Sequence, residues 1–298
     1  MPRSLVWTTY GALVLIWSST WVAIKIGLED MPPLLSAGVR FAIAGLGLLA
    51  VARALGRPLR TDVRLATVLA LLPFGAAYGL IYWGEQYVPS GLAAVLFGMM
   101  PLYSAGIAAV ALTGEPLRPR LVAGIAVALG GLALAFGESL ALGHAEWAAL
   151  AATACAIAPL ASAIGNVAIK RRGSLLDPVA LNGWAMLGGG AMLLLVSAPA
   201  EDWASATWSA QAVGTVAYLA AIGSAFPFVA LTLLLRELPA VTVSYITLLL
   251  PFGALVFGAA LYDERITAAA VAGAALVAGG LAIAQWPAPR RRATAAAP

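Results

Sequence analysis

Several long apolar runs of the sequence contain polar and aromatic side chains near their middles. Such side chains are costly in hydrocarbon unless they face a cavity or a neighbouring helix. Aromatic rings can stack on a ligand, and hydroxyl and amide groups can hydrogen-bond its polar parts. The runs therefore predict a cavity with aromatic walls and neutral hydrogen-bonding groups. Its candidate lining residues are Trp17, Thr20, Tyr78, Tyr82, Phe97, Met100, Tyr103, Asn166, Ser244 and Tyr245.

These side chains also have ordinary structural interpretations. A serine or threonine in a membrane helix commonly bonds a carbonyl of its own preceding turn, and a Trp or Tyr near a span end is usually an interfacial anchor. Tyr78 and Tyr82 share a helix face and, like Trp17, lie toward the middle of their runs, which favours the cavity. Pro101 and Pro251 each remove a backbone hydrogen bond within a run, so each predicts a bend or a carbonyl free to bind a ligand.

Arg40 is the one strongly charged residue inside a predicted span, about six residues or roughly 9 Å of helical rise from its outer end. Three roles are compatible with this position. The side chain can extend to the membrane surface, orient a substrate carboxylate, or form an ion pair with Glu29, Asp30 or Glu85. We expect the ion pair.

The sequence lacks the residues that most catalytic and metal sites require. Cys155 is the only cysteine and His144 the only histidine, so we expect no disulfide, no metal, no cofactor and no enzymatic activity. No Asp or Glu falls near the middle of a predicted span, and no GxxxxGK[ST] motif is present. These absences disfavour a proton relay, a drug-cation site and nucleotide-driven transport. They favour facilitated diffusion of a solute.

The composition puts these residues in a membrane. Of the 298 residues, 62% are hydrophobic and 10% are charged, whereas soluble domains carry about a quarter charged residues. Apolar runs of about 20 residues, each long enough to cross a bilayer core about 30 Å thick, recur along the chain. The predicted fold class is an all-α polytopic membrane protein whose single domain covers 1–298.

Ten spans are predicted between the charged, Pro-containing and Gly-containing connections. They cover 5–27, 34–53, 64–83, 90–112, 119–137, 146–170, 178–198, 211–235, 240–262 and 266–286. Most of the 17 Lys and Arg residues then lie on the side that holds both termini, and most acidic residues lie on the other side. Positive charge marks the cytoplasmic side, so we expect both termini to be cytoplasmic. Because the basic residues are in short connections and a tail, we expect no nucleic-acid partner.

The two halves of the chain share short motifs in the same order, at offsets of 145 to 150 residues. The matched segments are 22–25 with 167–170, 88–89 with 238–239, Pro101 with Pro251, and 114–115 with 263–264. Each half (5–137 and 146–286) holds five predicted spans, and an odd number forces the halves into opposite orientations. Inverted repeats of this kind can expose one site to each side of the membrane alternately.

Both halves resemble the EamA repeat of the drug/metabolite transporter superfamily. The resemblance depends on the WSSTWVAIK stretch at 17–25, on Gly114-Glu115-Pro116 after the fourth span, and on the corresponding 263–265 segment. Within this superfamily, the sequence resembles the YddG-type aromatic amino-acid exporters. The resemblance implies a carrier of the inner (plasma) membrane with ten helices around a central cavity. The third, fourth, eighth and ninth spans form most of this cavity, with help from the first and sixth.

The resemblance also implies export of neutral amino acids, such as aromatic amino acids, threonine or methionine, or of similar metabolites. Because the superfamily includes carriers of other solutes, a drug cation, a sugar derivative, a purine and a proton-coupled antiport mechanism stay open as alternatives. The expected partners are a small-molecule substrate and the lipid bilayer. The sequence does not determine the oligomeric state, and a monomer is compatible with it.

Overall fold

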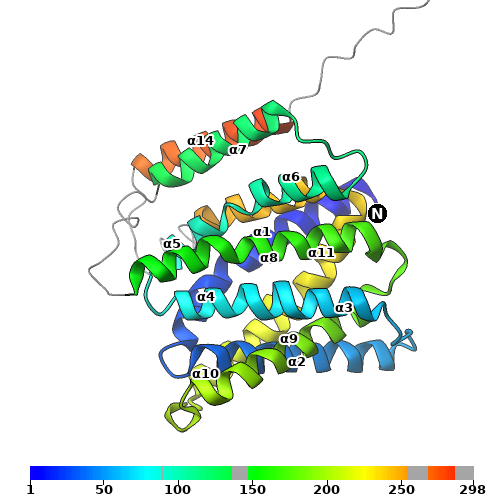
Figure 1. The fold of residues 1–298 in the computed structure, drawn as a ribbon, viewed down its shortest axis with the longest axis vertical. Coiled ribbons are helices and arrows are strands. Elements are labelled where there is room, and N and C mark those ends of the chain that lie inside the picture. Colours follow the sequence, from blue (N-terminus) through cyan, green and yellow to red (C-terminus); the bar gives the residue numbers. More distant parts are fainter. Residues whose placement is uncertain (89, 136–146, 254–267, 286–298) are drawn as a thin grey trace, which may run out of the picture.

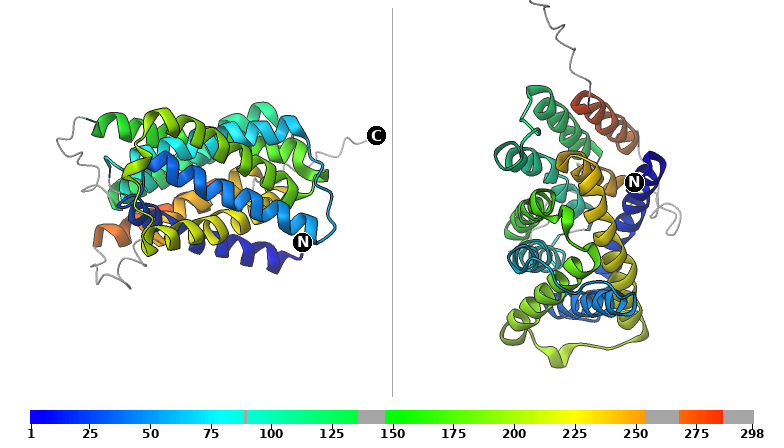
Figure 2. Two further views of the ribbon diagram at one scale, coloured as in Figure 1. Left: turned by 90° about the horizontal axis from the view of Figure 1, so that it is seen from below. Right: turned by 90° about the vertical axis from the view of Figure 1, so that its right-hand side faces the viewer.

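The computed structural model describes residues 1–88, 90–135, 147–253 and 268–285, and these residues form helices and connecting turns with no β-strand. The helices run alongside one another in one bundle (Figure 1, Figure 2). The predicted all-α class is therefore confirmed for the described part of the chain.

The first half contains α1 (Arg3–Gly27), α2 (Pro33–Ala54), α3 (Val63–Leu69), η1 (Ala70–Ala77), α4 (Tyr78–Gly84), α5 (Ser90–Phe97), α6 (Met100–Ala111) and α7 (Pro119–Ala135). The second half contains α8 (Ala148–Arg172), η3 (Gly173–Leu175), α9 (Pro178–Ala200), η4 (Trp203–Ser205), α10 (Ala210–Ala220), η5 (Ala221–Ala225), α11 (Phe226–Glu237), α12 (Ala240–Ser244) and α14 (Ala268–Gln285).

Seven described helices are long and apolar enough to cross a membrane: Arg3–Gly27, Pro33–Ala54, Val63–Gly84, Leu92–Ala111, Ala148–Arg172, Pro178–Ala200 and Ala210–Glu237. Three shorter apolar helices, Pro119–Leu134, Ala240–Gly253 and Val271–Ala284, lie within the fifth, ninth and tenth predicted spans. The chain is thus a multi-pass membrane protein, and the count of ten spans stays a prediction.

Close helix pairs depend on glycine. α2 packs along α9, and α7 packs along α14 at the upper edge of Figure 1. A Cβ added at Gly124 would lie 2.5 Å from the carbonyl oxygen of Gly280, and one at Gly131 would lie 2.6 Å from that of Gly273. The two backbones approach this closely because neither has a side chain between them. Gly124 and Gly131 in α7 and Gly273 and Gly280 in α14 therefore serve helix packing.

The third and eighth spans both contain a π-helical segment. In the span Val63–Gly84 it is η1, which includes Pro73, and in the span Ala210–Glu237 it is η5, which ends shortly before Pro227. A proline cannot donate the usual backbone hydrogen bond, and a π-turn accommodates the extra residue while redirecting the helix. The two segments occupy similar places in the two halves.

Two lysines make equivalent contacts in the two halves. Lys25 at the end of α1 donates to the carbonyl oxygen of Glu85, which follows α4, at 2.7 Å. Lys170 at the end of α8 donates to the carbonyl oxygen of Leu238, which follows α11, also at 2.7 Å. Each cation thus satisfies a carbonyl at the C-terminal end of another helix. An inverted repeat predicts such a matched pair.

The two ends of the bundle differ in charge. At one end, which we call the acidic end, a polar depression of about 550 Å³ is lined in part by Glu29, Asp30, Glu201 and Asp202. Glu201 also accepts hydrogen bonds from the first backbone amides of α2, at 2.8 and 2.9 Å.

At the other end, which we call the basic end, Arg57 pairs with Asp177 at 3.3 Å and Arg236 donates to the carbonyl of Gly173 at 3.0 Å. Glu115 accepts from the backbone amide of Ala240 at 3.0 Å and so caps α12. The counterpart of Glu115 in the second half, Glu264, lies outside the described residues. The alternation of charge between the two sides of the membrane stays a prediction.

Candidate solute-binding pocket

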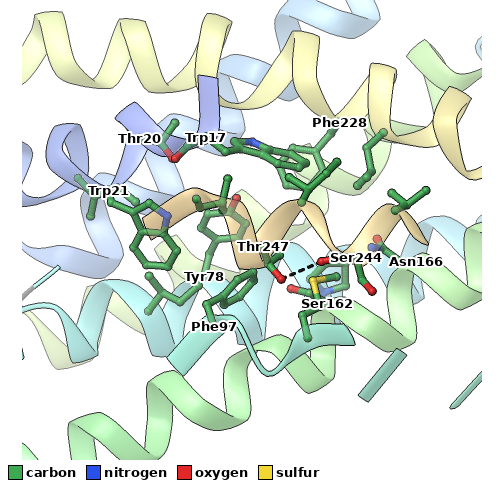
Figure 3. Close-up of a pocket in the computed structure, with 18 residues that line it drawn as sticks. Trp17, Thr20, Trp21, Tyr78, Phe97, Ser162, Asn166, Phe228, Ser244 and Thr247 are labelled. Carbon is green, nitrogen blue, oxygen red and sulfur yellow. Dashed lines mark hydrogen bonds between the residues drawn. The ribbon is translucent and has the colours of Figure 1, made fainter. Parts of the chain in front are cut away.

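An apolar pocket of about 70 Å³ lies inside the bundle. Helices from both halves contribute to it, among them α1, α4 and α5 from the first half and α8, α11 and α12 from the second (Figure 3). The predicted residues that line it are Trp17, Thr20, Tyr78, Phe97, Met100, Asn166 and Ser244. The predicted residues outside its lining are Tyr82, Tyr103 and Tyr245.

Aromatic rings form much of the pocket wall. The ring of Phe228 on α11 lies 5.4 Å from that of Trp17 and 6.2 Å from that of Tyr78, measured between centroids. Trp21 and Phe97 meet edge to face at 5.8 Å. The indole N–H of Trp17 donates to the carbonyl of Gly223 in η5 at 3.2 Å, which fixes its ring against the π-helical segment. Rings held at such angles offer flat apolar surfaces to a ligand.

Most hydroxyl groups of the wall already donate a hydrogen bond. Thr20 donates to the carbonyl of Trp17 at 2.8 Å, Ser244 to that of Val241 at 2.7 Å, and Thr247 to that of Ser244 at 2.8 Å. These are the local bonds expected of hydroxyls in membrane helices. Their oxygens keep lone pairs that can still accept a hydrogen bond.

Two polar side chains on α8 differ from these hydroxyls because they lack a hydrogen-bond partner. Ser162 and Asn166 lie one turn apart, are 8% and 6% exposed, and line the pocket. Within the described ranges neither side chain makes a hydrogen bond. A buried amide without a partner is costly, so these groups are available for a ligand or for water. Among the described residues of the wall, they are a serine hydroxyl and an asparagine amide that the protein itself leaves without a hydrogen-bond partner.

The tyrosines outside the pocket have structural contacts. Tyr103 donates to the carbonyl of Ala156 at 3.1 Å and joins α6 to α8. Tyr245 is 2% exposed and packs in the core, because it is rotated by about 100° from the lining residue Ser244 on the same helix. Tyr82 is fully buried and accepts a hydrogen bond from Arg40 at 3.0 Å.

Arg40 is fully buried behind Tyr78, whose ring lies 5.0 Å from the guanidinium carbon. Besides its bond to Tyr82, the guanidinium donates to the hydroxyl of Ser224 at 2.8 Å and to the carbonyl of Gly223 at 3.3 Å. In the described chain, none of the three expected acids forms an ion pair with it. The expected ion pair is therefore absent, since neutral groups, two of them in the π-helical η5, take up the donors.

The two prolines occupy different places in their spans. The fourth span is interrupted: α5 ends at Phe97, α6 begins at Met100, and Pro101 is in the first turn of α6. There the missing N–H costs nothing, because the first turn of a helix has no partner for it. Pro251 is buried within the helix Ala240–Gly253, and the rest of the predicted ninth span lies outside the described residues.

Phe228 and Trp21 both line the pocket but were not among the lining residues predicted from the sequence. A signal for Phe228 was present in the sequence. Pro73-Phe74 in the third span and Pro227-Phe228 in the eighth form the same dipeptide, and each lies within or just after a π-helical segment. The first pair contributes its proline to the pocket, and the second contributes its phenylalanine.

The chain is similar in sequence to several proteins named as transporters or exporters. The chain is 30% identical to the transporter YoaV of Bacillus subtilis, over 91% of this chain and 93% of the relative. It is 33% identical to the inner membrane transporter YedA of Escherichia coli K12, over 86% and 82%. It is 31% identical to a probable terminal-alkyne amino-acid exporter of Streptantibioticus cattleyicolor, over 72% and 71%.

A solved crystal structure shares the fold, with a TM-score of 0.80 and 21% identity over 95% of this chain and 97% of that chain. The model of the EamA-like transporter family matches the sequence twice, at residues 8–137 and 149–285. These two matches fall on the two halves identified by the internal motifs. The chain is a membrane transporter and belongs to the EamA-like transporter family.

Proposed function

We propose that this protein exports neutral amino acids, such as aromatic amino acids, threonine or methionine, or closely similar metabolites, by alternating access through the pocket. The observation that carries the proposal is the pair of unpartnered polar groups on α8, Ser162 and Asn166, opposite a wall of aromatic rings. An amide can donate to a carboxylate and accept from an ammonium group. The rings of Trp17, Tyr78 and Phe228 suit an apolar side chain.

The charge of the pocket supports a solute without net charge. No residue of its lining is Asp, Glu, Lys or Arg. A drug cation would favour a carboxylate in the wall, and a sugar phosphate would favour several cations. A relative named as a probable amino-acid exporter agrees with the proposed substrate class.

The same lining supports facilitated diffusion, because the pocket holds no acid that could carry a proton together with the solute. Its small volume, enough for a few water molecules, implies that helices must move before an amino acid enters. The charge difference between the two ends of the bundle supports cytoplasmic termini, with the basic end inside and the acidic end outside.

The test is uptake of radiolabelled amino acids by proteoliposomes containing the purified protein, beside protein-free vesicles. Asn166→Ala should lower the initial rate at subsaturating solute by about three- to tenfold, the effect of losing roughly one hydrogen bond. Thr153→Ala is the matched control on α8, because Thr153 is exposed and bonds only the carbonyl of Ala149. Equal rates for both variants would contradict the proposed site, and no uptake of any amino acid would contradict the substrate class.

A further inference from the structure

Glu85, the first residue after α4, is a buried acid outside the pocket. Its exposed fraction is 0%. Neither carboxyl oxygen has a hydrogen-bond partner among the described residues. An ionised carboxylate that is removed from water and receives no hydrogen bond is unstable. The site therefore favours a carboxyl group that has bound a proton.

The cations near Glu85 donate their hydrogen bonds to groups other than its carboxyl. Lys25, from α1, donates to the backbone carbonyl of Glu85 and not to its carboxyl group. Arg40, from α2, directs its donors to Tyr82, Ser224 and Gly223. Both cations attract the charged form from a distance, but burial has the larger effect and raises the pKa of Glu85 to about 8.

The remaining neighbours are neutral. Tyr82 on α4 directs its hydroxyl to Arg40. Cys155, from α8, lies against the preceding turn, since a Cβ added at Gly84 would be 2.5 Å from its sulfur. In the part of the chain that the structure describes, no group facing Glu85 thus donates a hydrogen bond to its carboxyl oxygens.

The position of Glu85 determines the side of the membrane with which it exchanges protons. The two residues that follow it, Gln86 and Tyr87, line the polar depression at the acidic end, together with Trp83. Glu85 is not among the residues that line the central pocket. The short route for a proton therefore leads to the solution at the acidic end and avoids the solute pathway.

We propose that Glu85 is a proton-binding site that holds the acidic end closed, so that the pH on that side sets the rate of solute transport while no proton crosses the membrane. Only the transport measurement of this site depends on the proposed function; the binding of the proton does not. Opening of this end would bring water to the carboxyl group and let it ionise. A proton that binds and leaves on the same side of the membrane cannot drive the solute against its gradient. Transport therefore remains facilitated diffusion.

The direction of the pH effect follows from linkage. The carboxyl has the higher pKa in the closed conformation, so closure is most favoured below the ordinary value of 4.5 and loses its advantage as the pH rises to about 8. Between about pH 6 and about pH 8, solute exchange at equal pH on both sides should therefore rise, by about three- to tenfold. Glu85→Gln imitates the protonated form and should stay at the low-pH rate throughout.

The first test needs no solute. Infrared spectra of the purified protein near pH 6 should contain a protonated-carboxyl C=O stretching band that disappears as the pH rises through about 8. Glu85→Gln should lack this band, and Glu29→Gln should retain it, since Glu29 is exposed at the same end and bonds only Gln211. An identical band in Glu85→Gln would overturn the proposal.

The second test is solute exchange in proteoliposomes at a series of equal internal and external pH values. The wild type and Glu29→Gln should show the rise, and Glu85→Gln should be flat while eluting as one species in detergent. If a pH gradient alone drives the solute uphill and Glu85→Gln abolishes this, Glu85 is a coupling site and the proposal is wrong. If the infrared band behaves as expected but no amino acid is transported, the proton site stands and the proposed substrate class fails.

Discussion

Among the described residues, the buried cation of Arg40 is held by neutral groups. Its guanidinium lies near the rings of Phe41 and Tyr78, at 5.1 and 5.0 Å, and donates to two hydroxyls and one carbonyl. Hydrogen bonds from a charged donor contribute more than neutral ones, and aromatic faces add further attraction. The network joins α2, α4 and η5 behind the pocket wall.

Removal of one acceptor from this network should destabilise the protein. Ser224→Ala takes away the hydroxyl that accepts from Arg40 at 2.8 Å, and we expect a loss of about 1.5–3 kcal/mol in the free energy of unfolding. Ser205→Ala is the control, because Ser205 is exposed in η4 and bonds only a neighbouring carbonyl. Thermal unfolding in detergent measures the difference. Equal melting temperatures for the two variants would show that the Ser224 bond contributes nothing.

Contacts between helices distinguish neighbouring glycines that the sequence pattern cannot tell apart. Gly130 and Gly131 are adjacent in α7, and both look equally permissive in the sequence. A Cβ at Gly130 meets nothing within 4 Å, whereas one at Gly131 would lie 2.6 Å from a backbone oxygen of α14. Only one of the two glycines therefore controls the distance between the helices.

These neighbours provide a matched test of helix packing. Gly131→Ala should force α7 and α14 apart and lower the free energy of unfolding by about 1–3 kcal/mol. Gly130→Ala should be neutral or slightly stabilising, because alanine favours the helix over glycine. Thermal unfolding of both variants in one detergent compares them. A larger loss for Gly130→Ala than for Gly131→Ala would refute the assigned packing.

The sequence predicted the helices and repeats better than the side-chain directions. Apolar length located the seven helices that are long enough to cross a membrane, and the short motifs divided the chain close to where the family matches divide it. Helical spacing could not reveal that Tyr82 accepts a hydrogen bond from Arg40, because the two residues are on different helices. The other partners of Arg40 are in η5, far away in the sequence. Helical spacing also missed the break between Phe97 and Met100, since both flanking segments are apolar.

At the scale of the whole molecule, Lys25 and Lys170 make equivalent contacts at opposite ends of the bundle. If the halves exchange conformations, each contact should stabilise closure of its own end. Loss of one contact should then favour opening of that end at the expense of the other.

The single cysteine can report this balance. Cys155 is 1% exposed and lies under the last turn of α4, near the acidic end. Lys25→Met should increase its labelling rate by a maleimide by about tenfold, the effect of a lost charged hydrogen bond. Lys170→Met should leave the rate unchanged or reduce it. The same acceleration in both variants would indicate general loosening and not a shift between two conformations.

The π-helical segments also affect how relatives should be aligned. Each π-turn contains one residue more than an α-helix of the same height requires, so a one-residue gap there changes phase as well as length. Deletion of one residue from η1 would restore regular winding and rotate the part of the span before it relative to α4 by about 100°. If Tyr78 then kept its place in the pocket, the connection that precedes the span would have to move. An alignment that moves such a gap by a few positions along η1 would therefore place Pro73, which lines the pocket, out of register.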